Sequence, residues 1–218
     1  MLTRKSSISK IMYALKSIIK RNSLIIKTIT IAFFIFLIIA IIISIVIFSS
    51  SPELIEELNS IMDSLFNFEN APEPSTGNFF LFIFLNNTGH FWNPIRMLVW
   101  IPLLGAFLLG FEILLNSGLI GVVSVIAGIE QGIAYPIIGL IPHGIIEIPA
   151  FLLQIICIVK WQVTIIEVIT SKIRHEELEK EKTVQDLKDI IILAAISIIL
   201  FMIAAAIETY ITPYLLGI

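Results

Sequence analysis

Charged residues are scarce in this sequence, and Lys and Arg are missing from a long part of it. Only 14% of the 218 residues are Asp, Glu, Lys or Arg, whereas 57% are hydrophobic, and the mean hydropathy is +0.99. Soluble globular domains carry about 25% charged residues, so almost none of this chain is expected to be a water-soluble domain. The single cysteine, Cys157, excludes an intramolecular disulfide.

The motifs of common soluble enzymes are also missing. The sequence has no glycine-rich phosphate loop, no Ser-His-Asp order and no cysteine cluster, so neither nucleotide binding nor ordinary hydrolysis is indicated. Nothing indicates a nucleic-acid partner or a bound cofactor. We therefore expect a protein without catalytic activity of its own, with an intramembrane metalloenzyme as the least favoured alternative.

Long apolar runs dominate what is present. Four of them exceed the roughly 20 residues that a helix needs to cross the hydrocarbon core, and one is marginal at 17 residues. They are expected to be helices, because lipid offers backbone polar groups no other partner. We predict an all-α, polytopic membrane protein with about five transmembrane helices. The runs are residues 28–48, 79–95, 97–128, 133–159 and 190–211.

The positions of the basic residues predict the orientation. Seven of the fourteen Lys and Arg precede the first run, none lies within residues 49–95, and six return within residues 160–188. Because basic loops stay on the cytoplasmic side, the acidic loop 49–78 is expected outside and the charged loop 160–189 inside. The protein is therefore predicted to be a multi-pass protein of the cell membrane, with a cytoplasmic N-terminus and an external C-terminus.

Two segments outside the runs have apolar residues at helical spacing. Residues 1–22 are predicted to be a basic amphipathic helix on the inner surface of the membrane, where it contacts lipid or a partner groove. It precedes a single transmembrane domain, residues 23–218. In the external loop, residues 52–66 are predicted to form a helix with carboxylates opposite its apolar stripe. This helix either packs over the bundle or binds partner proteins, and the bundle surface is a second possible binding surface for partners. The sequence is also compatible with a homo-oligomer.

The third and fourth runs contain residues that interrupt membrane helices. Asn116 lies among glycines in the third run, and Pro142 is one of three prolines in the fourth. Since each proline removes a helical hydrogen bond, both helices are predicted to be discontinuous near these positions, with the two breaks facing each other in the bundle. Gly118, Gly121 and Gly144 are expected to permit close approach of neighbouring backbones.

Polar residues inside the runs are the candidate site, because such groups are costly in lipid. His143 and Glu147 are four residues apart and share one helix face. They supply only two of the three or four donors that a zinc site needs. A satisfied internal network, a proton or cation path, and a metal site are the interpretations, in that order of preference. The candidate residues are Asn86, Glu112, Asn116, Gly118, Gly121, Pro142, His143, Gly144, Glu147 and Glu208.

Residues 142–150 read Pro-His-Gly-Ile-Ile-Glu-Ile-Pro-Ala. This sequence resembles the signature of the stage II sporulation protein M family, a widespread group of bacterial and archaeal membrane proteins. Residues 84–87, 116–121 and 207–213 resemble the family in the same order, so the resemblance covers about residues 79–213. It implies five spans with the N-terminus inside. It also implies a scaffold, since the sporulation namesake holds peptidoglycan-degrading enzymes together and has no established catalysis.

Two functions follow as hypotheses. The first is a non-catalytic scaffold that recruits or holds partner proteins at the membrane. The alternative is a transporter or permease-like subunit that uses a buried polar site at His143 and Glu147, since many transporters place broken helices around such sites. A cavity that reaches these two residues would favour transport, and a closed dry core would favour the scaffold.

Overall fold

The computed structural model describes residues 2–66 and 72–217, and these residues form helices joined by loops, with no strand among them. Within these ranges, four helices are long and apolar enough to cross a membrane. The prediction of an all-α membrane protein is confirmed. The four are α2 (Ser23–Ser50), α5 (Leu104–Gln131), α6 (Ala134–Ile173) and α7 (Lys180–Ala206), which is extended by η4 (Ile207–Ile211) and α8 (Thr212–Leu216).

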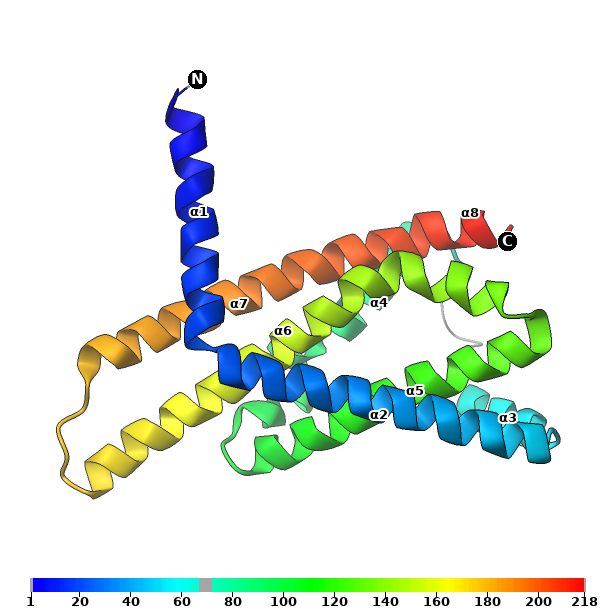
Figure 1. Ribbon diagram of the computed structural model, residues 1–218, viewed down its shortest axis with the longest axis horizontal. Helices are drawn as coiled ribbons and strands as arrows, with labels where there is room; N and C mark the ends of the chain where they lie inside the picture. The colour runs from blue at the N-terminus through cyan, green and yellow to red at the C-terminus, as the bar shows by residue number, and fades with distance from the viewer. Residues whose placement is uncertain (1, 67–71, 218) are drawn as a thin grey trace.

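The long helices pack in a bundle in which α6 lies along α7 and α2 lies along α5 (Figure 1). Large apolar side chains fill the centre, among them Phe33 of α2, Leu109 of α5 and Ile155 of α6. Many isoleucines on the outer faces are exposed instead, such as Ile38 and Ile42 of α2. Apolar residues on the outside of a bundle are stable when lipid surrounds it. This pattern therefore agrees with a location in the membrane.

The second run does not form one spanning helix. It forms α4 (Gly77–Asn87) and two 3-10 helices, η2 (Gly89–Phe91) and η3 (Arg96–Trp100). The end of α2 and the start of α5 lie at opposite ends of the bundle, and residues 77–103 connect them (Figure 1). In the described segments the chain thus passes five times between the two ends, four times as a long helix.

Local sequence explains why this second passage is irregular. Asn93 precedes Pro94, and the Asn93 side chain accepts hydrogen bonds from the backbone N–H groups of Ile95 and Arg96, at 3.0 and 3.3 Å. Asn and Pro in this arrangement stabilise a turn. A continuous helix therefore ends before this position.

The discontinuities predicted near Asn116 and Pro142 are wrong. The helix α5 is continuous through Asn116, whose side chain donates to the backbone carbonyl of Glu112 at 2.9 Å and is satisfied within the helix. The helix α6 is continuous through Pro142 and Pro149, although its first turns point in a different direction from the rest (Figure 1). The prolines thus bend this helix and do not end it. The irregular turn of the final passage is instead η4, a π-helix that contains Glu208.

Close packing at glycine is confirmed at one of the three predicted positions. A Cβ atom on Gly121 would lie 2.9 Å from the Cβ atom of Ala40 and 3.2 Å from the backbone nitrogen of Ile41, so α2 and α5 approach closely there. At Gly118 and Gly144, an added Cβ atom would meet no atom of the described chain within 4 Å. These two positions do not require glycine for packing.

Two helices lie at the ends of the bundle. The helix α1 (Leu2–Arg21) stands away from the bundle at a steep angle to α2 (Figure 1). The helix α3 (Leu54–Phe66) packs at the opposite end, where Ile55 is buried with Phe48 and Ile126. Leu58 also packs against this cluster, whereas Leu54 and Ile61 of the predicted apolar stripe are exposed. Packing on the bundle therefore accounts for only part of the apolar face of α3. Side chains of residues 62–66, including two of its predicted apolar stripe, lie outside the described ones.

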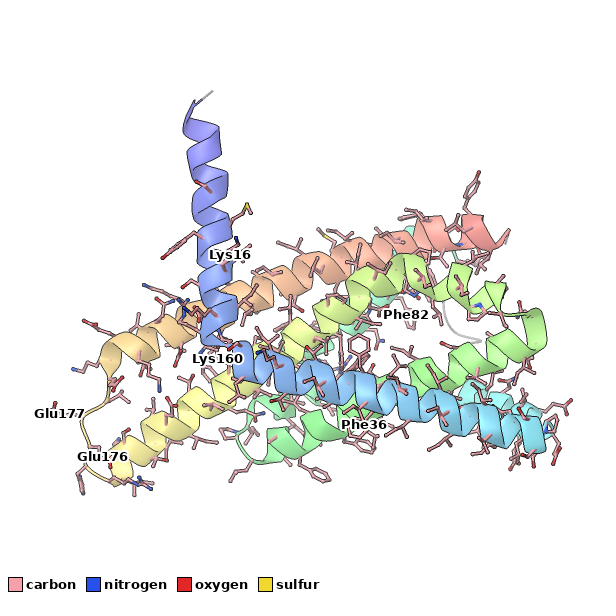
Figure 2. The ribbon with its side chains drawn as sticks, in the orientation of Figure 1. Lys16, Phe36, Phe82, Lys160, Glu176 and Glu177 are labelled. Atoms are coloured by element: carbon pink, nitrogen blue, oxygen red, sulfur yellow. The ribbon has the colours of Figure 1, made fainter. Side chains whose placement is uncertain are left out.

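Charged side chains gather at the end of the bundle where α1 joins it. Figure 2 shows Lys16 on α1, and Glu176 and Glu177 in the loop after α6, at this end, whereas Phe36 and Phe82 lie along the middle of the bundle. We call this the charged end. The basic residues of the first and last loops therefore lie on the same side of the molecule, as the charge pattern requires.

Candidate functional site

A cavity of about 190 Å³ lies between the helices; we call it the polar cavity for the polar side chains among its lining residues. Residues from α4, α5 and α6 line it, and the apolar side chains of Phe33, Phe151 and Phe201 close part of its wall. Five of the residues singled out from the sequence meet here, although they come from three helices far apart in the chain. The polar lining consists of Asn86, Asn87, Arg96, Asn116, His143 and Glu147, and Gly144 also lines the cavity.

A tight polar network fastens the irregular second passage to α5 and α6. Both ring nitrogens of the fully buried His90 face oxygen atoms: Nδ1 lies 2.9 Å from Oε1 of Gln154, and Nε2 lies 2.6 Å from Oε2 of Glu112. Arg96 lies 3.7 Å from the other carboxylate oxygen of Glu112 and donates to the backbone carbonyl of Asn86. These short contacts hold the three elements together, although His90 Nε2 and Glu112 Oε2 face each other without hydrogen-bond geometry.

The same passage is also attached along the length of α6. The Asn87 side chain donates a hydrogen bond to Glu147, and His90 is hydrogen-bonded to Gln154. In η3, the backbone carbonyl of Val99 accepts a hydrogen bond from Gln162 at 2.6 Å. The α6 partners advance from residue 147 to residue 162, which is about 22 Å at the helical rise per residue. Side chains thus replace the regular helix bonds that this passage lacks. His90, Arg96 and Gln154 were not predicted, although a histidine inside an apolar run was a usable signal.

A second cluster, formed by His143, Glu147 and Glu208, is held loosely. Nε2 of His143 lies 3.9 Å from Oε2 of Glu147, beyond hydrogen-bond distance. Nδ1 of His143 lies 3.3 Å from the Thr212 hydroxyl, and Asn87 donates to Oε1 of Glu147 at 2.8 Å. One potential ligand atom from each of the three residues lies within 4.8 Å of the others. We call these three residues the His–Glu–Glu cluster.

The His–Glu–Glu cluster lies between two cavities. His143 and Glu147 line the polar cavity, whereas His143, Glu208 and Thr212 line a second cavity of about 280 Å³. Tyr135 and residues of α8 also line this second cavity. His143 therefore lines both spaces, as does Leu140 one turn before it.

The remaining candidates have other surroundings. Gly118, Gly121 and Pro142 are not among the residues that line either of these two cavities in the described chain. Glu112 belongs to the tight network around His90. Glu130 of α5 is exposed near α3, where Asn59 donates to it at 3.3 Å. Glu112 is therefore a network residue, and Glu130 lies at the end of the bundle.

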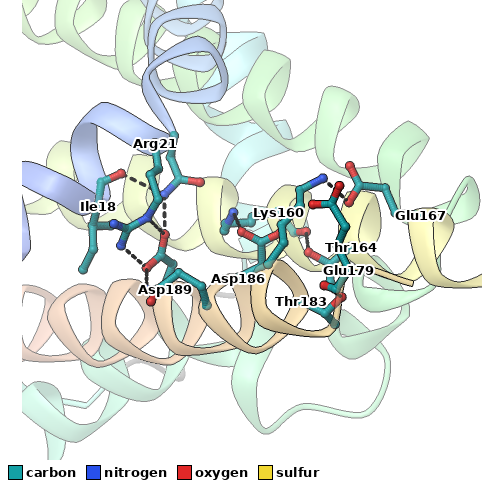
Figure 3. A network of polar contacts seen from close by, with 12 residues as sticks. Ile18, Arg21, Lys160, Thr164, Glu167, Glu179, Thr183, Asp186 and Asp189 are labelled. Carbon is teal, nitrogen blue, oxygen red and sulfur yellow. Dashed lines mark hydrogen bonds and ion pairs between the residues drawn. The ribbon is translucent and has the colours of Figure 1, made fainter. Parts of the chain in front are cut away.

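A further polar network joins α1 to the charged end of the bundle (Figure 3). Asp189 of α7 is fully buried and accepts hydrogen bonds from Arg21 at 2.6 and 3.0 Å and from Asn22 at 3.1 Å. Nearby, Lys160 of α6 lies 2.6 Å from Asp186 of α7. Both aspartates of this charged loop are therefore buried.

The contact with Asp189 also stabilises the charged form of Arg21, the α1 residue of this network. The hydrogen bond to Asp189 raises the pKa of the Arg21 guanidinium, which stays protonated under all physiological conditions. A guanidinium that binds both carboxylate oxygens gives a directional contact. The attachment of α1 to the bundle is thus an ion pair of fixed geometry.

Comparison with known proteins gives one family and one partial relative. Residues 29–213 match the family described as stage II sporulation protein M. A segment of 76 residues is 42% identical to an uncharacterized protein of Methanocaldococcus jannaschii, and it covers 34% of this chain and 39% of that relative. No solved structure matches the chain. The matched range contains the polar cavity, the His–Glu–Glu cluster and the tight network.

Proposed function

The chain belongs to the stage II sporulation protein M family, and from that premise we propose that it is a permease-like membrane protein whose His–Glu–Glu cluster binds a small cation. The observation that carries the proposal is the position of the cluster, whose residues line two neighbouring cavities. A cavity that reaches His143 and Glu147 is the feature that distinguishes transport from a closed scaffold.

The contrast between the two polar groups supports this proposal. Nε2 of His90 lies 2.6 Å from Oε2 of Glu112, whereas Nε2 of His143 lies 3.9 Å from Oε2 of Glu147. In the described part of the chain, neither Glu147 nor Glu208 forms an ion pair with Lys or Arg. Because a charge at membrane depth is costly without a counter-charge, a bound cation or proton would complete the cluster.

The arrangement also fits the general design of membrane transporters. Their binding sites lie near the middle of the bilayer and are built from irregular helical segments. Here the irregular second passage contributes Asn87, and the π-helix η4 contributes Glu208. Cavities on two sides of one cluster provide two routes by which a small cation could reach it.

The test is complementation of a deletion strain, with the amount of protein in the membrane measured in parallel. Glu147→Gln and Glu208→Gln remove a charge and keep the size of the side chain. If the cluster binds a cation, both variants should accumulate normally and fail to restore function. The matched control is Glu130→Gln, at the exposed end of α5, which should restore it. Restoration of function by both cluster variants at normal abundance would overturn the proposal.

A scaffold is the second candidate, and the ends of the molecule favour it. The helix α1 stands away from the bundle and exposes Met12 and Tyr13, while Glu56 and Glu57 of α3 are exposed at the opposite end. These surfaces could hold partner proteins without any catalysis. Affinity purification with a Glu56→Lys, Glu57→Lys variant tests this, because a scaffold should lose its partners there and keep them in Glu147→Gln.

A further inference from the structure

We propose that the cation is a divalent transition metal such as Zn²⁺, bound by Nε2 of His143 and by one carboxylate oxygen each from Glu147 and Glu208. This inference rests on the proposed function for the location of the site and adds the chemical class of the ligand. The sequence alone supplied only His143 and Glu147 at ligand spacing. The fold brings Glu208 to them from the last passage.

The distances are close to those of a metal site. Zinc binds histidine nitrogen and carboxylate oxygen at about 2.0–2.2 Å, so two ligand atoms of a tetrahedral site lie about 3.3 Å apart. In the cluster the three candidate ligand atoms lie within 4.8 Å of one another, and the His143–Glu147 pair is 3.9 Å apart. Side-chain rotations that move each atom by about 1 Å would therefore close the site around an ion.

Neighbouring side chains already orient two of the three donors. The contact of Thr212 with Nδ1 of His143 leaves Nε2 directed toward Glu147. Asn87 occupies Oε1 of Glu147 and leaves Oε2, the oxygen that faces His143. Metal-binding histidines commonly have their second nitrogen hydrogen-bonded in this way, and such bonds fix the ring orientation. Thr212 and Asn87 are therefore positioning residues for the metal.

Charge and donor type favour a transition metal over other cations. A neutral imidazole with two carboxylates carries two negative charges, which a divalent ion neutralises. Imidazole nitrogen is a ligand for Zn²⁺ and similar metals, whereas Ca²⁺ and Mg²⁺ prefer oxygen donors. Three protein donors leave one position open, and the adjacent cavity of about 280 Å³ has space for water there. An incomplete shell of this kind permits a metal to enter and leave.

The experiment is a titration of the purified, tag-free protein in detergent with Co²⁺, which reports a tetrahedral site through its visible d–d absorption. We expect one equivalent to bind and to be displaced by Zn²⁺. His143→Asn and Glu208→Gln should abolish the absorption. The matched control is His175→Asn, which removes an exposed histidine in the loop after α6 and should leave it unchanged. Thermal unfolding without metal shows whether each variant is folded.

The variant Thr212→Val is a second test that distinguishes an effect on metal binding from an effect on folding. This change removes the hydroxyl beside Nδ1 and keeps the size of the side chain, so Co²⁺ affinity should fall about 10- to 100-fold, the usual effect of losing an outer hydrogen bond. Absence of the absorption in the folded wild-type protein, or its persistence in folded His143→Asn, would overturn the metal assignment.

The two proposals fail in different ways. If Co²⁺ does not bind and Glu147→Gln still abolishes complementation, the metal assignment falls and the cation-binding function stands, with a proton as the carried charge. If Co²⁺ binds at the cluster and Glu147→Gln and Glu208→Gln both restore function, the metal assignment stands and the permease-like function falls.

Discussion

His90 and His143 are both buried histidines beside glutamates, but their surroundings differ. His90 contacts Gln154 and Glu112 at 2.9 and 2.6 Å, while His143 has its polar neighbours at 3.3 and 3.9 Å. Only His143 could be recognised directly from the sequence, because its glutamate is four residues away on the same helix. The partners of His90 lie 22 and 64 residues away, on other helices, and only the fold brings them together.

This difference predicts unequal effects on stability. His90→Ala removes the contacts to Oε2 of Glu112 and Oε1 of Gln154, and an unsatisfied buried polar group costs about 1–3 kcal/mol. His143→Asn removes only weak contacts and should cost about 1 kcal/mol or less, the usual value for one hydrogen bond between membrane helices. Unfolding of both purified variants under increasing denaturant measures the difference. Equal destabilisation would show that the cluster and the tight network have the same structural role.

Glycine packing gives a second prediction at single residues. Gly121→Leu should reduce the amount of folded protein, because its Cβ position lies 2.9 Å from Ala40, and overpacking costs about 1–3 kcal/mol. Gly118→Leu, three residues earlier on the same helix, has open space and should accumulate normally. Quantitative blotting of membrane fractions compares them. Normal accumulation of Gly121→Leu would contradict the observed approach of α2 and α5.

Among the elements, hydropathy predicted about five spanning helices, and four of them are long helices in the structure. It could not predict the form of the second passage, because its 17 residues are apolar enough for a span but include a turn at Asn93 and Pro94. The breaks in α5 and α6, which were predicted from the positions of asparagine, glycine and proline, are absent from these helices. Prolines in α6 produce a bend, and the side chain of Asn116 bonds within its own helix. The π-helix at Glu208 contains no proline or glycine from which it could have been predicted.

The attachment of α1 is testable at this scale. Asp189→Asn removes the negative charge that holds Arg21 and Asn22, so α1 should separate from the bundle more often. Faster tryptic cleavage at the basic residues between positions 20 and 27 would report this. The control is Glu176→Gln, an exposed carboxylate of the charged end. If cleavage is equally fast in both variants, the ion pair does not hold α1 in place.

For the whole molecule, charge counting predicted which loops share a side of the membrane. The Arg21–Asp189 contact places the start of α2 and the start of α7 at the same end, and α8 ends at the opposite one (Figure 1). A reporter fused to the C-terminus should therefore lie across the membrane from one fused to the N-terminus. Both reporters on the same side would contradict five passages. What the sequence could not predict was the cavity, because its lining residues come from separate helices.

Cation binding requires that the His–Glu–Glu cluster lies in a space that water and ions can reach. The most direct measurement of this access is labelling of Asn116→Cys, in a Cys157→Ala background, with a small charged thiol reagent that does not cross membranes. Asn116 lines the polar cavity, and Gly118→Cys on the same helix is the control outside it. If the cavity is open to water, we expect Asn116→Cys to react when the reagent is added to one side of the membrane and Gly118→Cys not to react. Lack of reaction at Asn116→Cys from both sides, in protein that accumulates normally, would contradict it.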